Sequence, residues 1–125
     1  MITNPHLLPK VRSDGLRREI ANMQCELRIA SFVGRSCSPG TVVPVHMDGL
    51  APSLGKGTGT KVSDLNMVAG CQTCHDILAR VDPVWQVILE RYPAAAQKQI
   101  HLSHQATLAR WLGAGRLIVP DGEII

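Results

Sequence analysis

Aromatic side chains are scarce in this chain of 125 residues, which has two Trp, one Tyr and one Phe, or 3% in all. Aromatic residues supply much of the buried area of a typical core, so their scarcity excludes a large aromatic core. The length suffices for one domain with a modest core and is too short for two. We therefore expect residues 1–125 to form a single domain, and a core of this size benefits from a metal that staples it.

Long apolar runs are also lacking. No stretch approaches the roughly 18 apolar residues of a membrane span, and the first residues lack the apolar core of a signal peptide. There are no repeats, coiled-coil heptads or low-complexity tracts either. From these absences we expect a cytoplasmic protein without a membrane partner; the oligomeric state is left open.

The chain also lacks a large excess of charged residues of one sign. The chain has 13 Lys and Arg against 10 Asp and Glu, a formal net charge of +3, and its 45% of hydrophobic residues is ordinary for a folded protein. Four thiolates around one zinc ion would lower the net charge to about +1. Net charge alone therefore does not argue for nucleic acid as a partner, and only local basic clusters could do so.

Hydrophobic periodicity and turn residues predict an α+β fold. An extended, proline-containing segment comes first, and a glycine-rich loop separates the two central strands. Pro44 favours an edge position for its strand. The predicted elements of the first two thirds are a helix over 14–24, a strand over 25–29, a loop over 31–40, a strand over 41–46, a loop over 49–60, a strand over 65–69 and a helix over 74–81 capped by Thr73.

The last third of the chain has the pattern of packing helices. Asp82 and Pro83 mark the start of a helix that ends before Pro93, and a longer helix over 94–112 follows, with a strand over 116–119 after it. The apolar stripes are predicted to be Val84, Trp85, Ile88 and Leu89 on the first helix, and Ile100, His104, Leu108, Trp111 and Leu112 on the second. His104 is expected to be a hydrogen-bonded core or interface histidine, whereas His6 and His101 are expected at the surface.

Four cysteines indicate a metal more than disulfides, because disulfides are rare in a reducing compartment. Cys71 and Cys74 have the tight C-x2-C spacing of a zinc knuckle, and Cys25 and Cys37 form a looser second pair. We predict a structural zinc ion held by all four; free buried cysteines without metal are the alternative. The run C-x-x-C-H also fits a c-type haem attachment, but that requires export and leaves the first pair unexplained.

Basic residues occur at two places that could contact phosphate. Arg17 and Arg18 lie on the polar face of the first predicted helix, and Lys56 and Lys61 flank the glycine-rich loop, which lacks the spacing of a Walker A loop. A solvated surface is the alternative for each. Contacts of this kind would bind DNA independently of sequence and would weaken with salt.

Three further residues complete a pattern with the cysteines. His46 ends a predicted strand, Asn66 follows it, and His75 comes directly after the second cysteine pair. This order resembles the zinc-stapled branch of the HNH, or ββα-metal, nuclease superfamily. It resembles more closely the small prophage-encoded YbcO-like nuclease family, whose relatives include the phage recombination nucleases Ref and Rap. The resemblance covers roughly residues 12–118, and the matching stretches are C-E-L-R-I, V-H-M, G-T-G-T-K, D-L and C-Q-T-C-H-D.

The resemblance implies roles for these residues. His46 would take a proton from the attacking water, and His75 with Asp76 would bind a catalytic Mg²⁺ or Mn²⁺ ion beside the structural Zn²⁺. Asn66 would hold the loop so that the first histidine is correctly oriented, with Asp64 as the rival for that position. The implied function is metal-dependent cleavage of DNA with little sequence preference, in phage recombination or DNA processing, with a recombinase as a candidate partner.

The sequence departs from the family pattern at two positions where many HNH sites have metal ligands. These positions hold Val45 and Ala79, so the ion would depend on His75 and Asp76 with water, or on Asp48. The alternative function is therefore a non-catalytic, zinc-bound DNA- or protein-binding module. In either case we expect a basic N-terminal arm over 1–24, a zinc-stapled ββα core over 25–81, and C-terminal helices with a tail over 82–125.

Overall fold

Two antiparallel strands form the centre of the fold in the computed structural model, which describes residues 9–47, 63–80 and 82–125. Strand β1 (Val42–His46) pairs with strand β2 (Met67–Cys71), in a register that sets Val42 opposite Cys71 and His46 opposite Met67. The predicted strand over 41–46 is confirmed, and the one over 65–69 forms two residues later. Pro44 is tolerated because β1 has only one partner strand.

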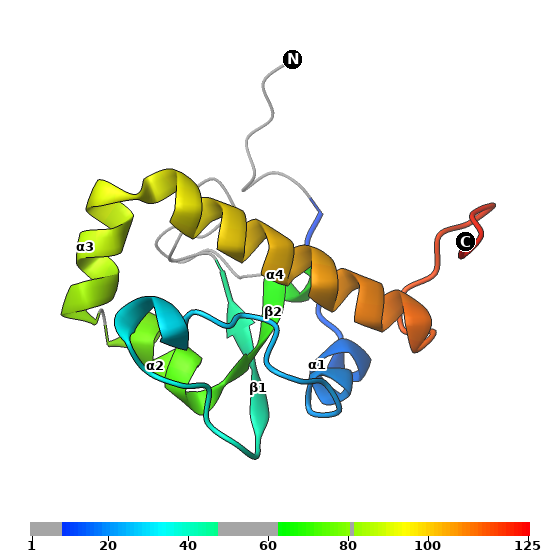
Figure 1. The fold of residues 1–125 in the computed structure, drawn as a ribbon. Helices are drawn as coiled ribbons and strands as arrows, with labels where there is room; N and C mark the ends of the chain where they lie inside the picture. The colour runs from blue at the N-terminus through cyan, green and yellow to red at the C-terminus, as the bar shows by residue number, and fades with distance from the viewer. Residues whose placement is uncertain (1–8, 48–62, 81) are drawn as a thin grey trace.

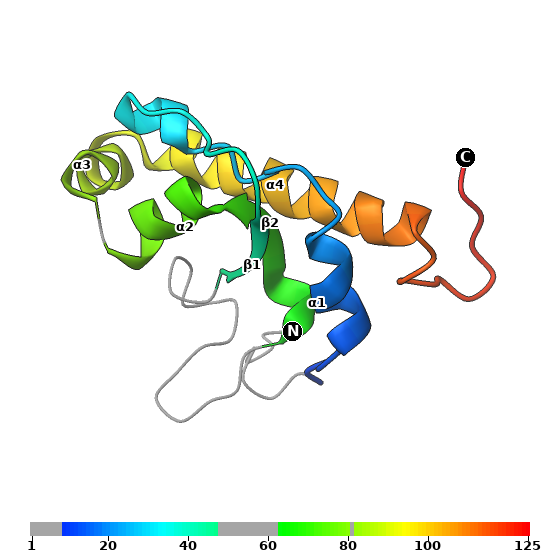
Figure 2. The ribbon, with the colours of Figure 1, turned by 90° about the horizontal axis from the view of Figure 1, so that it is seen from below.

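Helices surround this hairpin, as Figures 1 and 2 show. Helix α2 follows β2 directly and packs against both strands, which completes a ββα unit. Helix α3 then leads into the long helix α4, which crosses over β2. The helical elements are α1 (Asp14–Ile20), the 3-10 turn η2 (Ala30–Val33), the 3-10 turn η4 (Asp64–Asn66), α2 (Gln72–Ala79), α3 (Pro83–Arg91) and α4 (Pro93–Gly113).

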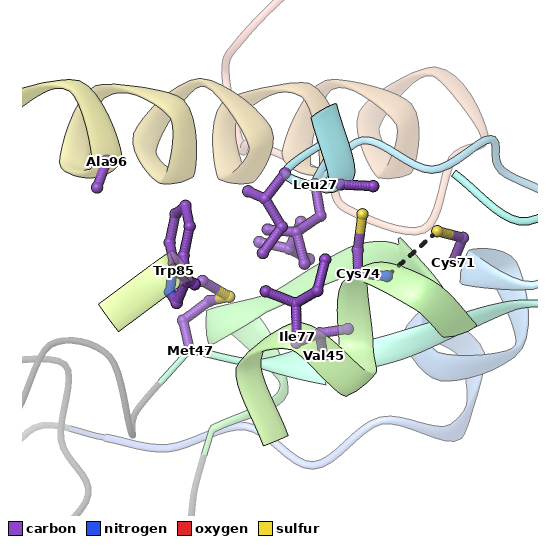
Figure 3. Packing of buried hydrophobic residues seen from close by; sticks show 11 residues of the cluster. Leu27, Val45, Met47, Cys71, Cys74, Ile77, Trp85 and Ala96 are labelled. Atoms are coloured by element: carbon purple, nitrogen blue, oxygen red, sulfur yellow. Dashed lines mark hydrogen bonds between the residues drawn. The ribbon is translucent and has the colours of Figure 1, made fainter. Parts of the chain in front are cut away.

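The hairpin carries a separate apolar cluster on each face. Because successive strand residues point to opposite faces, Val68 packs on one face and Met67 and Ala69 on the other. The first cluster lies among η2, α2 and α3 and contains Trp85 (Figure 3), and the second lies against α1 and the C-terminal half of α4. All five residues of β2 are buried, because this strand is covered on both faces.

Helix α4 braces the hairpin with polar contacts as well as apolar ones. The Oγ1 atom of Thr107 accepts a hydrogen bond from the Ala69 N–H at 3.2 Å, and the Oγ atom of Ser103 donates to the Leu27 carbonyl at 3.2 Å. The buried residues of α4 are Ala96, Ser103, Thr107 and Trp111. The predicted stripe on α4 is confirmed for Trp111, which is buried, and for Ile100 and Leu108, which are partly buried and pack against the two clusters. The fully buried Ser103 and Thr107 were not predicted.

Three predicted local structures differ from those observed. Residues 25–29 form no strand, because Arg28 has a positive φ of 49° and the N–H groups of Glu26 and Leu27 both donate to the Ala69 carbonyl. Residues 116–119 form no strand either, since Arg116 N–H donates to the Trp111 carbonyl at the end of α4. The first helix ends at Ile20 rather than at residue 24.

Of the two predicted helix caps, one is confirmed and one is wrong. Asp82 caps α3 through hydrogen bonds from Val84 N–H and Trp85 N–H, as expected. Thr73 does not cap α2: the helix begins earlier, and the sulfur of Cys71 accepts from Cys74 N–H at its start. His6, Asp48, Lys56 and Lys61 lie outside the described residues. Within the described part of the chain, no helix is both long and apolar enough to span a membrane.

Candidate metal centre and histidine site

The four cysteine sulfurs converge at one point, although they come from three separate segments. Their Sγ atoms all lie within 4.8 Å of one another. The Sγ of Cys25 is 3.7 Å from that of Cys74, and the Sγ of Cys37 is 3.8 Å from both. Four sulfurs at zinc–thiolate bond length around a tetrahedral ion would lie about 3.8 Å apart. The cluster can therefore hold a metal such as zinc.

Backbone N–H groups donate hydrogen bonds to two of these sulfurs, and such bonds stabilise the thiolate form. Cys71 ends β2 and Cys74 lies in the first turn of α2, and the sulfur of the former accepts a hydrogen bond from the N–H of the latter at 3.4 Å (Figure 3). On the other side, the Cys25 sulfur accepts from Arg28 N–H at 3.4 Å. Arg28 itself has a left-handed backbone, with a φ of 49°.

The pKa values of the clustered thiols shift in opposite directions. Contact with the Cys74 sulfur lowers the pKa of Cys25 to about 4, against the effect of burial, whereas contact with Cys25 and burial raise the pKa of Cys74 well above its usual value. Burial and the neighbouring Cys25 charge also raise the pKa of Cys37 to about 11. Without a cation these sulfurs cannot all be ionised, and a divalent cation removes that conflict.

At the opposite end of β1, His46 contacts a buried carboxylate. Its Nε2 atom lies 3.2 Å from Oδ1 of Asp64, whose side chain has 0% exposure, whereas the histidine side chain is 29% exposed. The two residues face each other because His46 ends β1 and Asp64 opens the 3-10 turn that leads into β2. The side chain of Ser63 caps this turn by accepting from Leu65 N–H.

Asp64 accepts further hydrogen bonds from the segment that begins α1. Its Oδ2 atom accepts hydrogen bonds from Ser13 N–H at 2.7 Å and from Arg17 Nε at 3.0 Å. Its Oδ1 atom accepts one from Arg17 Nη2 at 2.9 Å. Burial raises the pKa of Asp64, but the bonds from Arg17, Ser13 and His46 outweigh it and hold the pKa below its usual value. The carboxylate therefore remains ionised at neutral pH.

An ionised carboxylate can only accept hydrogen bonds, so the Nε2 atom of His46 is the donor in this pair. In the neutral ring, Nδ1 then carries the free lone pair. The carboxylate thus fixes the tautomer of His46 and leaves one nitrogen able to take up a proton.

His75 and Asp76 lie in the first half of α2 and are both partly exposed. Nδ1 of His75 is 3.5 Å from Oδ1 of Asp76, and Gln72 Nε2 lies 2.9 Å from that same oxygen and 3.4 Å from the histidine nitrogen. The hydrogen bond from Gln72 lowers the pKa of Asp76 against the opposing effect of burial, and His75 contributes in the same direction as Gln72. This arrangement gives two candidate metal ligands at one place.

The structure brings together some of the residues predicted for the site. Among the described residues, the cysteines are the only group of three or more His, Cys, Asp or Glu arranged to hold a metal. Between the two rivals for orienting His46, Asp64 is hydrogen-bonded to its ring, while Asn66 accepts from Met47 N–H through its backbone carbonyl. Arg18 is exposed on α1, as expected.

Two contacts of the site have no signal in the sequence. The guanidinium of Arg17, predicted to face phosphate or solvent, binds Asp64 across 47 residues of sequence. His104, predicted to be a hydrogen-bonded histidine, has its Nε2 atom 2.6 Å from the carbonyl oxygen of Leu65, inside the turn that carries Asp64. Only the folded arrangement of α1, α4 and η4 could reveal these partners.

A scan against protein-family models found no match to this chain, and searches of curated proteins and of solved structures found none either. The assignment of function therefore depends on the sequence resemblance and on the geometry of the site.

Proposed function

We propose that this protein is a metal-dependent endonuclease of the HNH type that cleaves DNA. The observation that carries the proposal is the His46–Asp64 pair at the end of a ββα unit whose helix begins within the cysteine cluster. A histidine at the end of the first strand and a second one on the following helix is the arrangement that the resemblance to YbcO-like nucleases implies. A ββα unit of this kind supports the proposal because it holds both histidines on regular elements.

In this proposal His46 is the general base. Its Nδ1 atom would take the proton from the water that attacks the phosphodiester, while Nε2–H continues to donate to Asp64. The carboxylate would hold the ring in one orientation and stabilise the imidazolium that forms. The 29% exposure of the His46 side chain leaves the ring accessible to substrate.

His75 and Asp76 would hold the catalytic divalent ion. Magnesium is commonly bound through one or two carboxylates, with water and substrate phosphate completing its shell. Asp76 would supply such a carboxylate, and His75 would add a nitrogen ligand. When bound, the ion would polarise the scissile phosphate and stabilise the leaving oxygen. The hydrogen bond from Gln72 to Asp76 would keep that carboxylate oriented and ionised.

The four cysteines would bind a structural zinc ion rather than a catalytic one. All four positions around a tetrahedral ion would be filled by sulfur, which leaves no site for water or substrate. The ion would join the loop that contains Cys37 to β2 and α2, and so fix the ββα unit. DNA would be the substrate with little sequence preference, in phage recombination or DNA processing.

Nicking of supercoiled plasmid by the zinc-loaded protein, with Mg²⁺ or Mn²⁺ and with neither, tests this function. We expect cleavage that requires the added ion and that is lost in His46→Ala and in His75→Ala. His101→Ala is the matched control, because this histidine is exposed on α4 and should be dispensable. Cleavage that survives both active-site changes would show that the activity has another source.

A non-catalytic, zinc-bound module that binds DNA or protein is the second candidate. The observation that favours it is the pair of positions where further metal ligands are expected: Val45 is 4% exposed in the apolar core, and Ala79 is an exposed alanine. Binding of DNA that is unaffected by His46→Ala, with no cleavage under any divalent ion, would support this function instead.

A further inference from the structure

We infer that Arg17 is a positioning residue for His46: its guanidinium fixes the Asp64 carboxylate in the orientation that accepts the imidazole N–H. The inference deepens the proposed function and rests on it for its kinetic consequence. Its structural consequence, the state of the His46 ring, can be measured whether or not the protein cleaves DNA.

The contacts divide evenly over the two carboxylate oxygens. Oδ1 of Asp64 contacts Arg17 Nη2 at 2.9 Å and His46 Nε2 at 3.2 Å. Oδ2 contacts Arg17 Nε at 3.0 Å and Ser13 N–H at 2.7 Å. The guanidinium is thus the one group among the described residues that binds both oxygens, in the two-pronged geometry that arginine forms with carboxylates.

This geometry matters because the final torsion of an aspartate side chain is soft. The separate bonds from Ser13 to Oδ2 and from His46 to Oδ1 hold the carboxylate plane less tightly than a rigid fork that binds both oxygens. The charge of Arg17 also offsets the burial of Asp64, which has no exposed surface. Loss of the guanidinium should therefore weaken the hydrogen bond to His46 through both orientation and ionisation.

The helix that carries Arg17 is itself anchored. The Oγ atom of Ser13 caps α1 by accepting from Leu16 N–H at 3.2 Å. At the other side of the helix, the buried Nε1 atom of Trp111 donates to the Leu16 carbonyl at 3.0 Å. The guanidinium that binds Asp64 thus belongs to a helix that is hydrogen-bonded to α4.

Arg17 and Arg18 are equivalent candidates for phosphate contact in the sequence, and the structure separates them. Arg17 directs two donors at a buried carboxylate, while its neighbour is exposed on α1. Arg18→Ala is therefore a matched control for Arg17→Ala, because it removes the same charge one residue away and leaves Asp64 untouched.

The first test is the ¹⁵N spectrum of the His46 ring in the zinc-loaded, full-length protein, at about pH 8, where imidazole is ordinarily neutral. The wild type and Arg18→Ala should show a ring protonated at Nε2. In Arg17→Ala the two ring nitrogens should move toward averaged positions, because the acceptor that selects the tautomer is no longer fixed. A wild-type ring spectrum in Arg17→Ala overturns the inference.

The second test is kinetic. Arg17→Ala should lower kcat about 10-fold or more, the scale seen when a partner that orients a site residue is removed, with KM unchanged. A phosphate contact would instead raise KM and reduce the slope of log affinity against log salt by about 1. That second pattern, with an unchanged ring spectrum, contradicts the positioning role.

Arg17→Lys decides the question if Arg17→Ala fails to fold. A lysine keeps the charge but lacks the rigid planar fork that makes two parallel hydrogen bonds to a carboxylate, so a positioning role predicts a perturbed His46 ring and a lowered kcat. A phosphate contact predicts that both stay near the wild type. If the wild type itself cleaves no DNA, the proposed function fails, and the ring spectra of the three variants still decide the role of Arg17.

Discussion

The side chains of His46 and Asp64, eighteen residues apart, meet at 3.2 Å where β1 ends and the turn before β2 begins. One partner is fully buried and the other is partly exposed, so the pair connects the interior to the surface. A buried carboxylate can stay ionised only with several donors, and here they come from α1, from the backbone and from His46 itself. The packing of α1 is thus linked to the state of the histidine.

Asp64→Asn should destabilise the protein by about 1–3 kcal/mol at neutral pH, the cost of disrupting the bonds of a buried polar group. Because the folded-state pKa of Asp64 lies below its ordinary value, its stabilising effect should persist above about pH 4 and be lost as the pH falls through the lowered pKa. Urea unfolding of both proteins from pH 3 to about 8 measures this. A stability difference that grows toward acid pH would contradict it.

Loss of one cysteine ligand should release the metal. We expect wild type to bind close to one zinc ion per chain, and Cys37→Ser to lose it together with about 3 kcal/mol or more of stability. Ser36→Ala is the control, because the neighbouring Ser36 is also exposed and is not among the four clustered residues. Elemental analysis and thermal unfolding give both values. Equal stability of the two variants with and without a chelator would exclude a structural metal.

The two tryptophans should respond differently to replacement by phenylalanine. Both are buried, but Trp111 Nε1 donates to the Leu16 carbonyl, whereas Trp85 Nε1 has no hydrogen-bond partner among the described residues. Trp111→Phe removes this hydrogen bond and should cost about 0.5–1.5 kcal/mol more than Trp85→Phe. Urea unfolding measures the difference. The reverse order would show that the contact between α4 and α1 adds little.

Gly70 is required by the close approach of β1 and the segment before η2. A Cβ atom at this position would lie 2.8 Å from Cγ2 of Val45 and 3.3 Å from Cδ2 of Leu27. Gly70→Ala should therefore cost about 1–3 kcal/mol through overpacking. Gly113→Ala, where a Cβ would meet nothing within 4 Å, is the control and should be neutral or stabilising. Chemical unfolding that shows equal stability for both would contradict the packing described here.

How far the sequence predicts this structure depends on whether a feature is local. Asp82 before Pro83 predicted the start of α3, and the strand ending at His46 was recognised from its β-branched residues. Both depend on neighbours in sequence. The convergence of Cys25 with Cys74 was predicted only because thiols in a reducing compartment favour a shared metal.

Features that depend on distant partners could not be predicted. Residues 116–119 have the composition of a strand but form none, because the N–H groups of Arg116 and Leu117 donate to the Trp111 carbonyl at the end of α4. Arg28 interrupts an alternating pattern with a positive φ, and its N–H donates to the Cys25 sulfur instead of to a neighbouring strand. The contact between Arg17 and Asp64 likewise exists only once α1 has packed beside η4.

Chemical rescue tests the central claim, that the His46 ring is the base, most directly. The single-turnover rate of plasmid nicking by His46→Ala is measured with and without added imidazole, beside Asp64→Asn and His101→Ala. We predict that imidazole restores cleavage to His46→Ala alone, because it can occupy the space left by the missing ring and accept the proton. A His46→Ala variant that cleaves at the wild-type rate without imidazole would contradict the account.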